Sequence, residues 1–323
     1  MNRREKRGMK YWIRGMRDAF FESLYSIAQK DKKVILVTAD TGAICLDRFR
    51  KNLNKQYINV GIAEQNMVGL ASGLALSGKT VYVYAISPFV TARCFDQVKI
   101  DLCCMDLPVT VVGIGAGFDY STLGPTHHGT EDIALMRTLP GMTIYSPSDS
   151  LSASLFAKIS HKHKGPAYIR LDREGLPAVY KKKEDIDANA GFSLLKKGGD
   201  LCIISTGRMV YNSLEVSKRL SQKAISASVI DLFRIKPLNA EEILRKIEHN
   251  KHIVTIEEHF TTGGIGSAMA EALSSARGAG HFLKSIGIPD KFCRRYGSRE
   301  YLKCLNKLDT DNLVKVIERW VRG

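Results

Sequence analysis

The stretch NVGIAEQNMVGLASGLALSG, residues 59–78, places one carboxylate where a β-strand gives way to a helix. It begins inside YINV, which has strand character, and its later apolar residues recur at helical spacing: Met67, Leu70, Ala71, Leu74 and Ala75. Glu64 therefore falls in the first turn of the predicted helix. Acids favour first turns through the helix dipole alone, so this position does not establish a function by itself.

The length and composition are those of a folded globular protein. The 323 residues are enough for two domains with cores of their own. Hydrophobic residues make up 44% of the chain and charged residues 25%, with no low-complexity tract. No apolar run approaches the roughly 18 residues that span a bilayer, and the start, MNRREKRGMKYW, lacks an apolar signal core. We therefore expect a cytoplasmic protein that does not contact a membrane.

The chain is strongly basic, with 48 Lys and Arg against 33 Asp and Glu and a formal net charge of +15. Such a charge suits nucleic acid or an anionic substrate. Basic residues are spread along the chain, apart from clusters in residues 1–17 and 181–183, and no nucleic-acid-binding motif accompanies them. We therefore expect no nucleic acid partner, and attribute the charge to surface solvation, a basic N-terminal arm and recognition of phosphorylated sugars. The seven cysteines show no CxxC pair, so we expect reduced thiols and no metal site.

Strands alternate with helices along the chain, which is typical of a parallel α/β sheet. The predicted strands are residues 34–40, 80–86, 108–114, 142–147 and 167–171, and then 200–206, 226–232, 252–258 and 281–288. We predict an α/β fold with two domains, each a mainly parallel sheet with flanking helices. Its predicted parts are a basic arm (1–11), a first domain (12–180), a charged linker (181–191) and a second domain (192–323). The last helix should start near Thr310, with Asp309 as its N-cap.

Residues 73–80, GLALSGKT, fit the phosphate-loop pattern GxxxxGK[ST]. A phosphate loop must leave a strand and open a helix, so that backbone N–H groups face the phosphates. Here a predicted helix enters the motif and a predicted strand leaves it. The sequence therefore favours Gly78 as a helix C-cap over a nucleotide site.

Further motifs point to a family. They are SPFVTARCFDQVKIDL (87–102), GPTHHGTEDIALMRTLPGM (124–142), IRLDREG (169–175) and VTIEEHFTTGGIGSAMAEAL (254–273). Together with residues 59–78 they resemble, in order and spacing, the C-terminal half of a transketolase in the form found as a separate small subunit. The resemblance covers about residues 12–323 and implies a pyrimidine-binding domain of the thiamine-diphosphate enzymes, followed by a transketolase C-terminal domain.

The resemblance implies contacts to the cofactor from Glu64 and Phe89, and Tyr84 is a further candidate. In the family a glutamate at the position of Glu64 hydrogen-bonds the aminopyrimidine of thiamine diphosphate and promotes the imino tautomer, which deprotonates the thiazolium carbon. Phe89 is the aromatic residue expected to stack on the pyrimidine, although a core phenylalanine would also suit its position. Tyr84 is expected to pack in the core or to line the cofactor pocket.

The resemblance also implies contacts to the substrate. His127 is expected to bind the donor ketose hydroxyl and to assist proton transfer. His128 either shares that role or faces solvent. Arg173 matches a position that binds the sugar phosphate, and Arg17 is a second candidate, because a guanidinium donates parallel hydrogen bonds to phosphate. Either arginine could instead be a surface ion-pair partner.

Two departures from the family pattern change the expected specificity and assembly. Leu123 stands four residues before His127, where common transketolases carry an acid that recognises the acceptor hydroxyl. This difference favours a less hydroxylated, branched or modified acceptor, unless Asp119 or Tyr120 replaces the acid. The chain also lacks a GDG motif followed by Asn, which is the family's signature for Mg²⁺ and diphosphate. A partner subunit should therefore carry those ligands in a heterotetramer with two copies of each chain.

The resulting hypothesis is the small subunit of a thiamine-diphosphate-dependent transketolase. It would move a two-carbon ketol unit from a ketose phosphate to an aldehyde, and would be inactive without the N-terminal, diphosphate-binding subunit. Whether the isolated chain dimerises stays open. The alternatives are the beta subunit of a 2-oxo-acid or acetoin dehydrogenase, an enzyme like 1-deoxyxylulose-5-phosphate synthase, and a non-catalytic binding subunit.

Overall fold

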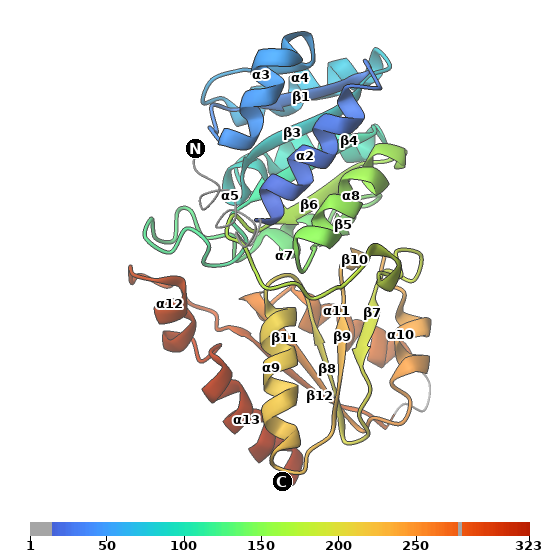
Figure 1. Ribbon diagram of the computed structural model, residues 1–323, viewed down its shortest axis with the longest axis vertical. Helices are drawn as coiled ribbons and strands as arrows, with labels where there is room; N and C mark the ends of the chain where they lie inside the picture. The colour runs from blue at the N-terminus through green and yellow to red at the C-terminus, as the bar shows by residue number, and fades with distance from the viewer. Residues whose placement is uncertain (1–14, 277–279) are drawn as a thin grey trace, which may run out of the picture.

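Each half of the chain forms one β-sheet with helices on both faces, and the two halves follow each other along the long axis of the molecule (Figure 1). The structure, a computed structural model, describes residues 15–276 and 280–323. The predicted basic arm, residues 1–11, lies outside the described residues. The predicted fold class, two α/β domains with mainly parallel sheets, is confirmed.

The first sheet has the strand order β10-β5-β6-β4-β3-β1-β2. Its parallel strands are β1 (Val34–Thr38), β2 (Tyr57–Asn59), β3 (Thr80–Ile86), β4 (Val109–Ile114), β5 (Thr143–Tyr145) and β6 (Ala167–Leu171). These strands read as nearly continuous apolar runs because helices cover both faces of the sheet.

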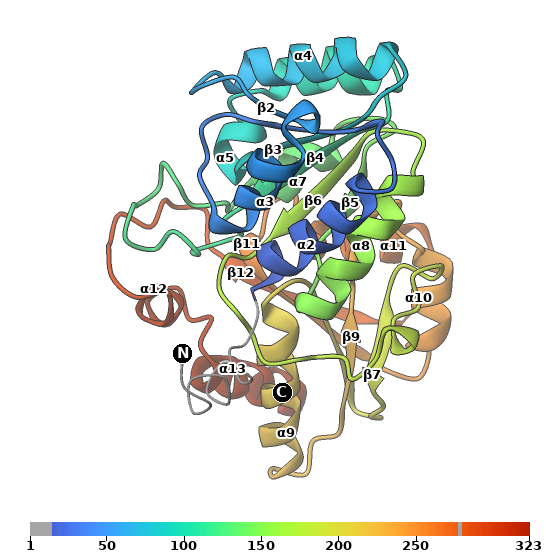
Figure 2. The same cartoon turned by 45° about the horizontal axis from the view of Figure 1, so that its top comes forward.

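Helices on the two faces of the first sheet bury alternate residues of each strand. Ile35 and Val37 of β1 pack in the cluster that contains α4 (Glu64–Leu76), whereas Val34 and Leu36 pack in the cluster of α2 (Met16–Ala28) and α8 (Ser150–Lys162). Figure 2 shows α4 on the opposite side of the sheet from α2 and α8. Shorter helical segments complete this domain: η2 (Ile44–Leu46), α3 (Asp47–Asn52), η3 (Asn54–Gln56), α5 (Ser87–Val90), α6 (Phe95–Gln97), η4 (Val98–Cys104) and α7 (Asp132–Arg137).

The second sheet has the order β12-β11-β8-β9-β7. Its strands are β7 (Ser193–Lys196), β8 (Leu201–Ser205), β9 (Ala227–Asp231), β11 (His252–Phe260) and β12 (Phe282–Ile288), of which β7 is the antiparallel edge. Its helices are α9 (Met209–Ser221), α10 (Ala240–Lys246), α11 (Ile265–Ser275), α12 (Arg299–Leu305) and α13 (Thr310–Arg322). The predicted start of the last helix is confirmed, because the Asp309 side chain accepts a hydrogen bond from the Asn312 N–H.

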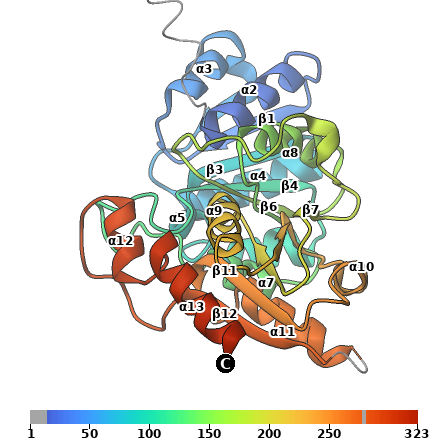
Figure 3. The ribbon, with the colours of Figure 1, turned by 60° about the horizontal axis from the view of Figure 1, so that its bottom comes forward.

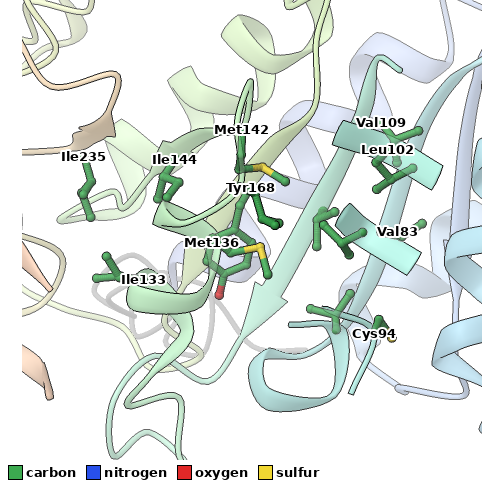
Figure 4. Packing of buried hydrophobic residues seen from close by; sticks show 14 of the residues in the cluster. Val83, Cys94, Leu102, Val109, Ile133, Met136, Met142, Ile144, Tyr168 and Ile235 are labelled. Carbon is green, nitrogen blue, oxygen red and sulfur yellow. The ribbon is translucent and has the colours of Figure 1, made fainter. Parts of the chain in front are cut away.

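One strand crosses between the halves, which the sequence pattern did not predict. β10 (Arg234–Lys236) belongs to the second half by chain order but pairs antiparallel with β5 at the edge of the first sheet. Ile235 of β10 packs in the same core cluster as Ile144 of β5, as Figure 4 shows. A strand of three residues is too short to show the alternation of a β-strand in its sequence. Its pairing depends instead on the otherwise unpaired edge of β5 beside it. The expected linker, residues 181–191, contains a short helical turn, η5 (Lys183–Asp185).

Residues 73–80, which match the phosphate-loop pattern, have the structure expected of a helix-to-strand turn. α4 ends at Leu76, Gly78 has a φ of 82°, and β3 begins at Thr80. A left-handed φ favours glycine after a helix end. The C-cap residue itself is Ser77, and Gly78 is the next residue, whose left-handed conformation ends the helix, so the predicted helix end is off by one residue.

Candidate active site

The predicted site residues gather at the carboxyl ends of the parallel strands of the first sheet. Glu64 follows β2, Phe89 follows β3, His127 follows β4 and Arg173 follows β6. Because these strands run parallel, their carboxyl ends and the segments that follow them lie at the same edge, where α/β proteins bind ligands. Residues far apart in the sequence therefore come together.

Glu64 is a buried carboxylate at the start of α4. Its side chain is 4% exposed, and its Oε2 accepts a hydrogen bond from Arg93 Nη1 at 2.7 Å. The Arg93 side chain is 43% exposed. Sequence reasoning did not single out Arg93, although this residue lies in the same motif as Phe89 and is a cation in a mostly apolar stretch.

Arg93 and Phe89 together link Glu64 to His127. The guanidinium carbon of Arg93 lies 4.1 Å from the centre of the half-buried Phe89 ring, which is a cation–π contact. The His127 ring meets the Phe89 ring edge-on, with 5.0 Å between centroids. Glu64, Arg93, Phe89 and His127 therefore form an unbroken row of contacts.

His127 continues the row toward Arg173. Its ring centre lies 6.2 Å from that of Tyr120, and the Arg173 guanidinium lies 4.8 Å from the Tyr120 ring centre. Burial, and next the positive charge of Arg93, lower the pKa of His127 below its usual value. His127 is therefore mainly neutral near pH 7 and can accept a proton. Its Nδ1 lies 2.9 Å from Thr126 Oγ1, which leaves Nε2 for another partner.

Two predicted site residues lie inside the protein. Tyr84 is 1% exposed and packs edge-on against Phe21, with 4.8 Å between ring centres. It is a core residue of β3, which favours the packing alternative over a place in the cofactor pocket. His128 is 2% exposed and packs against Phe118, so it does not face solvent as one alternative supposed. Burial lowers the pKa of His128 to about 4, which keeps it neutral.

The loop before His127 presents Leu123 rather than an acid. Leu123 is 47% exposed. Asp119, which was expected as one substitute for the acid, is 2% exposed and accepts a hydrogen bond from the Arg173 backbone N–H at 2.8 Å. Asp119 is therefore engaged inside the protein, and the suggestion that it meets an acceptor is corrected. Tyr120 is only half-buried and stands beside His127.

Arg17 lies near Arg173 but is less accessible. Gly15 pairs with Gly175 in an isolated bridge, which brings the start of α2 beside the segment that follows β6. The Arg17 side chain is 18% exposed and its Nε donates to Asp18 Oδ1 at 2.9 Å. It lines a hollow of about 370 Å³ with Tyr25, Cys45 and Arg48, among others.

Two residues of the second domain, Glu258 and Arg299, hold the loop that carries His127. The sequence did not indicate this role for either residue. Glu258 Oε1 accepts a hydrogen bond from the Phe118 N–H at 2.7 Å. Arg299 Nε donates to the same oxygen at 2.9 Å, and its Nη2 donates to the Ala116 carbonyl at 3.0 Å. These long-range contacts leave no periodic signal in the sequence.

An aromatic side chain of the second domain also covers the same loop. A Cβ on Gly124 would lie 2.6 Å from the Tyr296 ring, so the two are in close contact. Figures 2 and 3 show the segment leading into α12 beside this loop. The second domain is therefore placed to orient His127.

Comparison with known proteins identifies the family. Residues 14–178 match the profile of the transketolase pyrimidine-binding domain, and residues 192–311 match that of the transketolase C-terminal domain. This chain belongs to the transketolase family. The resemblance inferred from the sequence motifs is thereby confirmed.

Subunit-length transketolase relatives match this chain from end to end. It is 36% identical to a subunit of the apulose-4-phosphate transketolase of Phocaeicola vulgatus, over 95% of this chain and 97% of the relative. It is also 36% identical to a 6-deoxy-6-sulfo-D-fructose transketolase subunit of a Clostridium species, over 91% and 89%. A solved split-gene transketolase, described as an inactive β4 tetramer, is 29% identical with a TM-score of 0.85 and covers 95% of this chain and 98% of its own.

Single-chain relatives are longer. The chain is 34% identical to a 1-deoxy-D-xylulose-5-phosphate synthase of Geobacter sulfurreducens, but spans only 47% of that protein. Its length is therefore that of the transketolase subunits.

The residues of the row fit the pyrimidine end of thiamine diphosphate, the cofactor of this transketolase family. Glu64 offers a buried acceptor oxygen and Phe89 an aromatic face, and both already hold one planar group, the Arg93 guanidinium. Within residues 15–276 and 280–323, no group of three or more His, Cys, Asp and Glu could hold a metal ion. None of the helices in those ranges is long and apolar enough to cross a membrane.

Proposed function

We propose that this chain is the pyrimidine-binding subunit of a two-subunit transketolase. With its partner it moves a two-carbon ketol unit from a ketose phosphate to an aldehyde. The observation that carries the proposal is the buried Glu64 carboxylate, which lies in one row with Phe89 and His127 at the ligand-binding edge of the sheet.

Glu64 and Phe89 bind and orient the cofactor in this proposal. Thiamine diphosphate, when bound, supplies an aminopyrimidine that acts as the base for its own thiazolium carbon. Glu64 holds a proton at the pyrimidine ring nitrogen, and its fixed place at the start of α4 keeps that hydrogen bond preorganised. Phe89 adds an aromatic surface worth about 1 kcal/mol beyond simple burial.

His127 acts on the substrate in this proposal. A neutral imidazole with Nε2 available can accept a proton from a ketose hydroxyl and later return it. His128 is buried against Phe118 and supports the loop from inside. We therefore assign proton transfer to His127.

Arg173 recognises the anionic end of the sugar, with Arg17 as a second contact. Its side chain is 42% exposed beside Tyr120, at the far end of the row from Glu64. The two related transketolase subunits, from Phocaeicola vulgatus and Clostridium, are named for sugars with a phosphate or a sulfo group, both anionic. The exposed Leu123 favours an acceptor that lacks the hydroxyl recognised by an acid in common transketolases.

A partner subunit completes the site in this proposal. The sequence has no GDG motif followed by Asn, so the partner supplies the ligands for Mg²⁺ and diphosphate. Apolar side chains are exposed close to Glu64 along the chain: Ile62 is 80% exposed, Leu70 36% and Leu76 61%. Exposed apolar residues of this kind mark protein interfaces. We propose a heterotetramer with two copies of each chain.

Calorimetric titration of thiamine diphosphate with Mg²⁺ tests the proposal. The titration is run into this chain alone and into its mixture with the diphosphate-binding subunit. Binding only in the mixture supports a site divided between subunits. Absence of binding in both would leave a non-catalytic subunit as the better explanation.

A further inference from the structure

We propose that Arg93 fills the place of the aminopyrimidine in the isolated subunit. Thiamine diphosphate then binds only when the Arg93 side chain leaves Glu64 and Phe89. The inference rests on the proposed function and adds to it a residue that competes with the cofactor.

The contacts of Arg93 reproduce those expected of the pyrimidine. Its guanidinium is a planar group with N–H donors, as is an aminopyrimidine protonated at its ring nitrogen. One donor reaches Glu64 Oε2 at 2.7 Å, while the central carbon of the group lies 4.1 Å from the Phe89 ring centre. The His127 ring also contacts Phe89, with 5.0 Å between centroids and 70° between the ring planes. The cofactor and the guanidinium therefore require the same oxygen and the same aromatic surface.

Only the side chain of Arg93 has to move. Gln65 Nε2 donates to the Arg93 carbonyl at 3.2 Å, and the Arg93 N–H donates to the Pro88 carbonyl at 3.2 Å. The Cys94 thiol donates to the Phe89 carbonyl at 3.1 Å, which holds the same turn. Since the Arg93 side chain is 43% exposed, it can rotate into water while the backbone beneath it stays in place.

The burial of Glu64 explains why a substitute is needed. A carboxylate that is 4% exposed loses most of its hydration, and without a partner it destabilises the fold. Arg93 provides that partner before the cofactor arrives. The same contact weakens cofactor binding, because its free energy must be given up when the pyrimidine enters.

The Arg93→Ala variant tests this competition. Loss of the competing ion pair and cation–π contact should tighten thiamine diphosphate binding by about tenfold in the mixture with the partner subunit. The melting temperature of the isolated variant subunit should fall by about 2–4 °C. Lys284→Ala is the matched control, because Lys284 Nζ lies 5.9 Å from the Trp320 ring centre in a cation–π contact within the second domain.

A second variant separates competition from a general structural role. In the Glu64→Gln background the neutral amide needs no cation, so adding Arg93→Ala should lower the melting temperature much less. If the wild-type mixture binds the cofactor and the Arg93→Ala mixture binds it equally or more weakly, the inference is refuted while the proposed function stands. If neither mixture binds it, the proposed function fails and the inference fails with it.

Discussion

Replacing Arg299 with methionine should lower the free energy of unfolding by about 3–5 kcal/mol. Arg299 is 5% exposed, joins the two domains through the buried carboxylates of Asp172 and Asp119, and also pairs with the buried Glu258 of its own domain. Methionine keeps an unbranched side chain but leaves these carboxylates without their shared cation. Burial, and next the charge of Asp172, already raise the pKa of Asp119 to about 7, so this group can take up a proton. Because a protonated Asp119 no longer needs the Arg299 cation, we expect a loss of stability near the lower end of the range, about 3 kcal/mol.

Chemical denaturation of the isolated subunit, followed by circular dichroism, measures this loss. Arg295→Met is the control, because Arg295 is an exposed arginine of the same segment and its loss should change stability by less than about 0.5 kcal/mol. A loss below about 1 kcal/mol in Arg299→Met would show that the buried ion pairs do not hold the domains together.

Arg299→Met should weaken substrate binding by the assembled enzyme more than it weakens cofactor binding. Arg299 and Glu258 hold the backbone of Ala116 and Phe118, which begin the loop that carries His127. Glu64 lies on a different segment. We therefore expect the KM of the assembled enzyme for the ketose phosphate to rise while its affinity for thiamine diphosphate stays within about twofold. Equal losses of both affinities would contradict a role limited to this loop.

Three further changes address the site and the buried charges. Glu64→Gln should leave the fold intact and cut activity of the assembled enzyme by about 10²–10³-fold, and near-normal turnover would remove Glu64 from the mechanism. Leu123→Asp should raise kcat/KM for α-hydroxylated acceptors relative to their deoxy analogues, whereas a strong preference of the unmodified enzyme for the hydroxylated acceptor would refute the role given to Leu123. Burial raises the pKa of Asp231 to about 7, so the stability that this group contributes in its protonated form is lost as pH rises from about 4 to 7. Asp231→Asn should reduce that slope by up to about 1.4 kcal/mol per pH unit in denaturation curves, and an unchanged slope would exclude Asp231 as its source.

Part of the candidate site was predictable because local motifs mark it. Glu64 follows a short strand and opens an apolar helix, and the segments after β3, β4 and β6 carry Phe89, His127 and Arg173. Parallel strands bring such segments to one edge whatever the details of packing. The sequence also indicated that Gly78 ends a helix, against its match to a phosphate loop.

The sequence alone determined the alternation of strands and helices, the family and the main site candidates, since these depend on local periodicity and short motifs. Tertiary structure decided which polar side chains are open to a ligand. It buries Tyr84, Asp119 and His128, pairs Glu64 with Arg93, and joins β10 to a sheet formed by the other half of the chain. Each of these outcomes depends on residues distant in the sequence, and burial and long-range pairing have no local period from which they could be predicted.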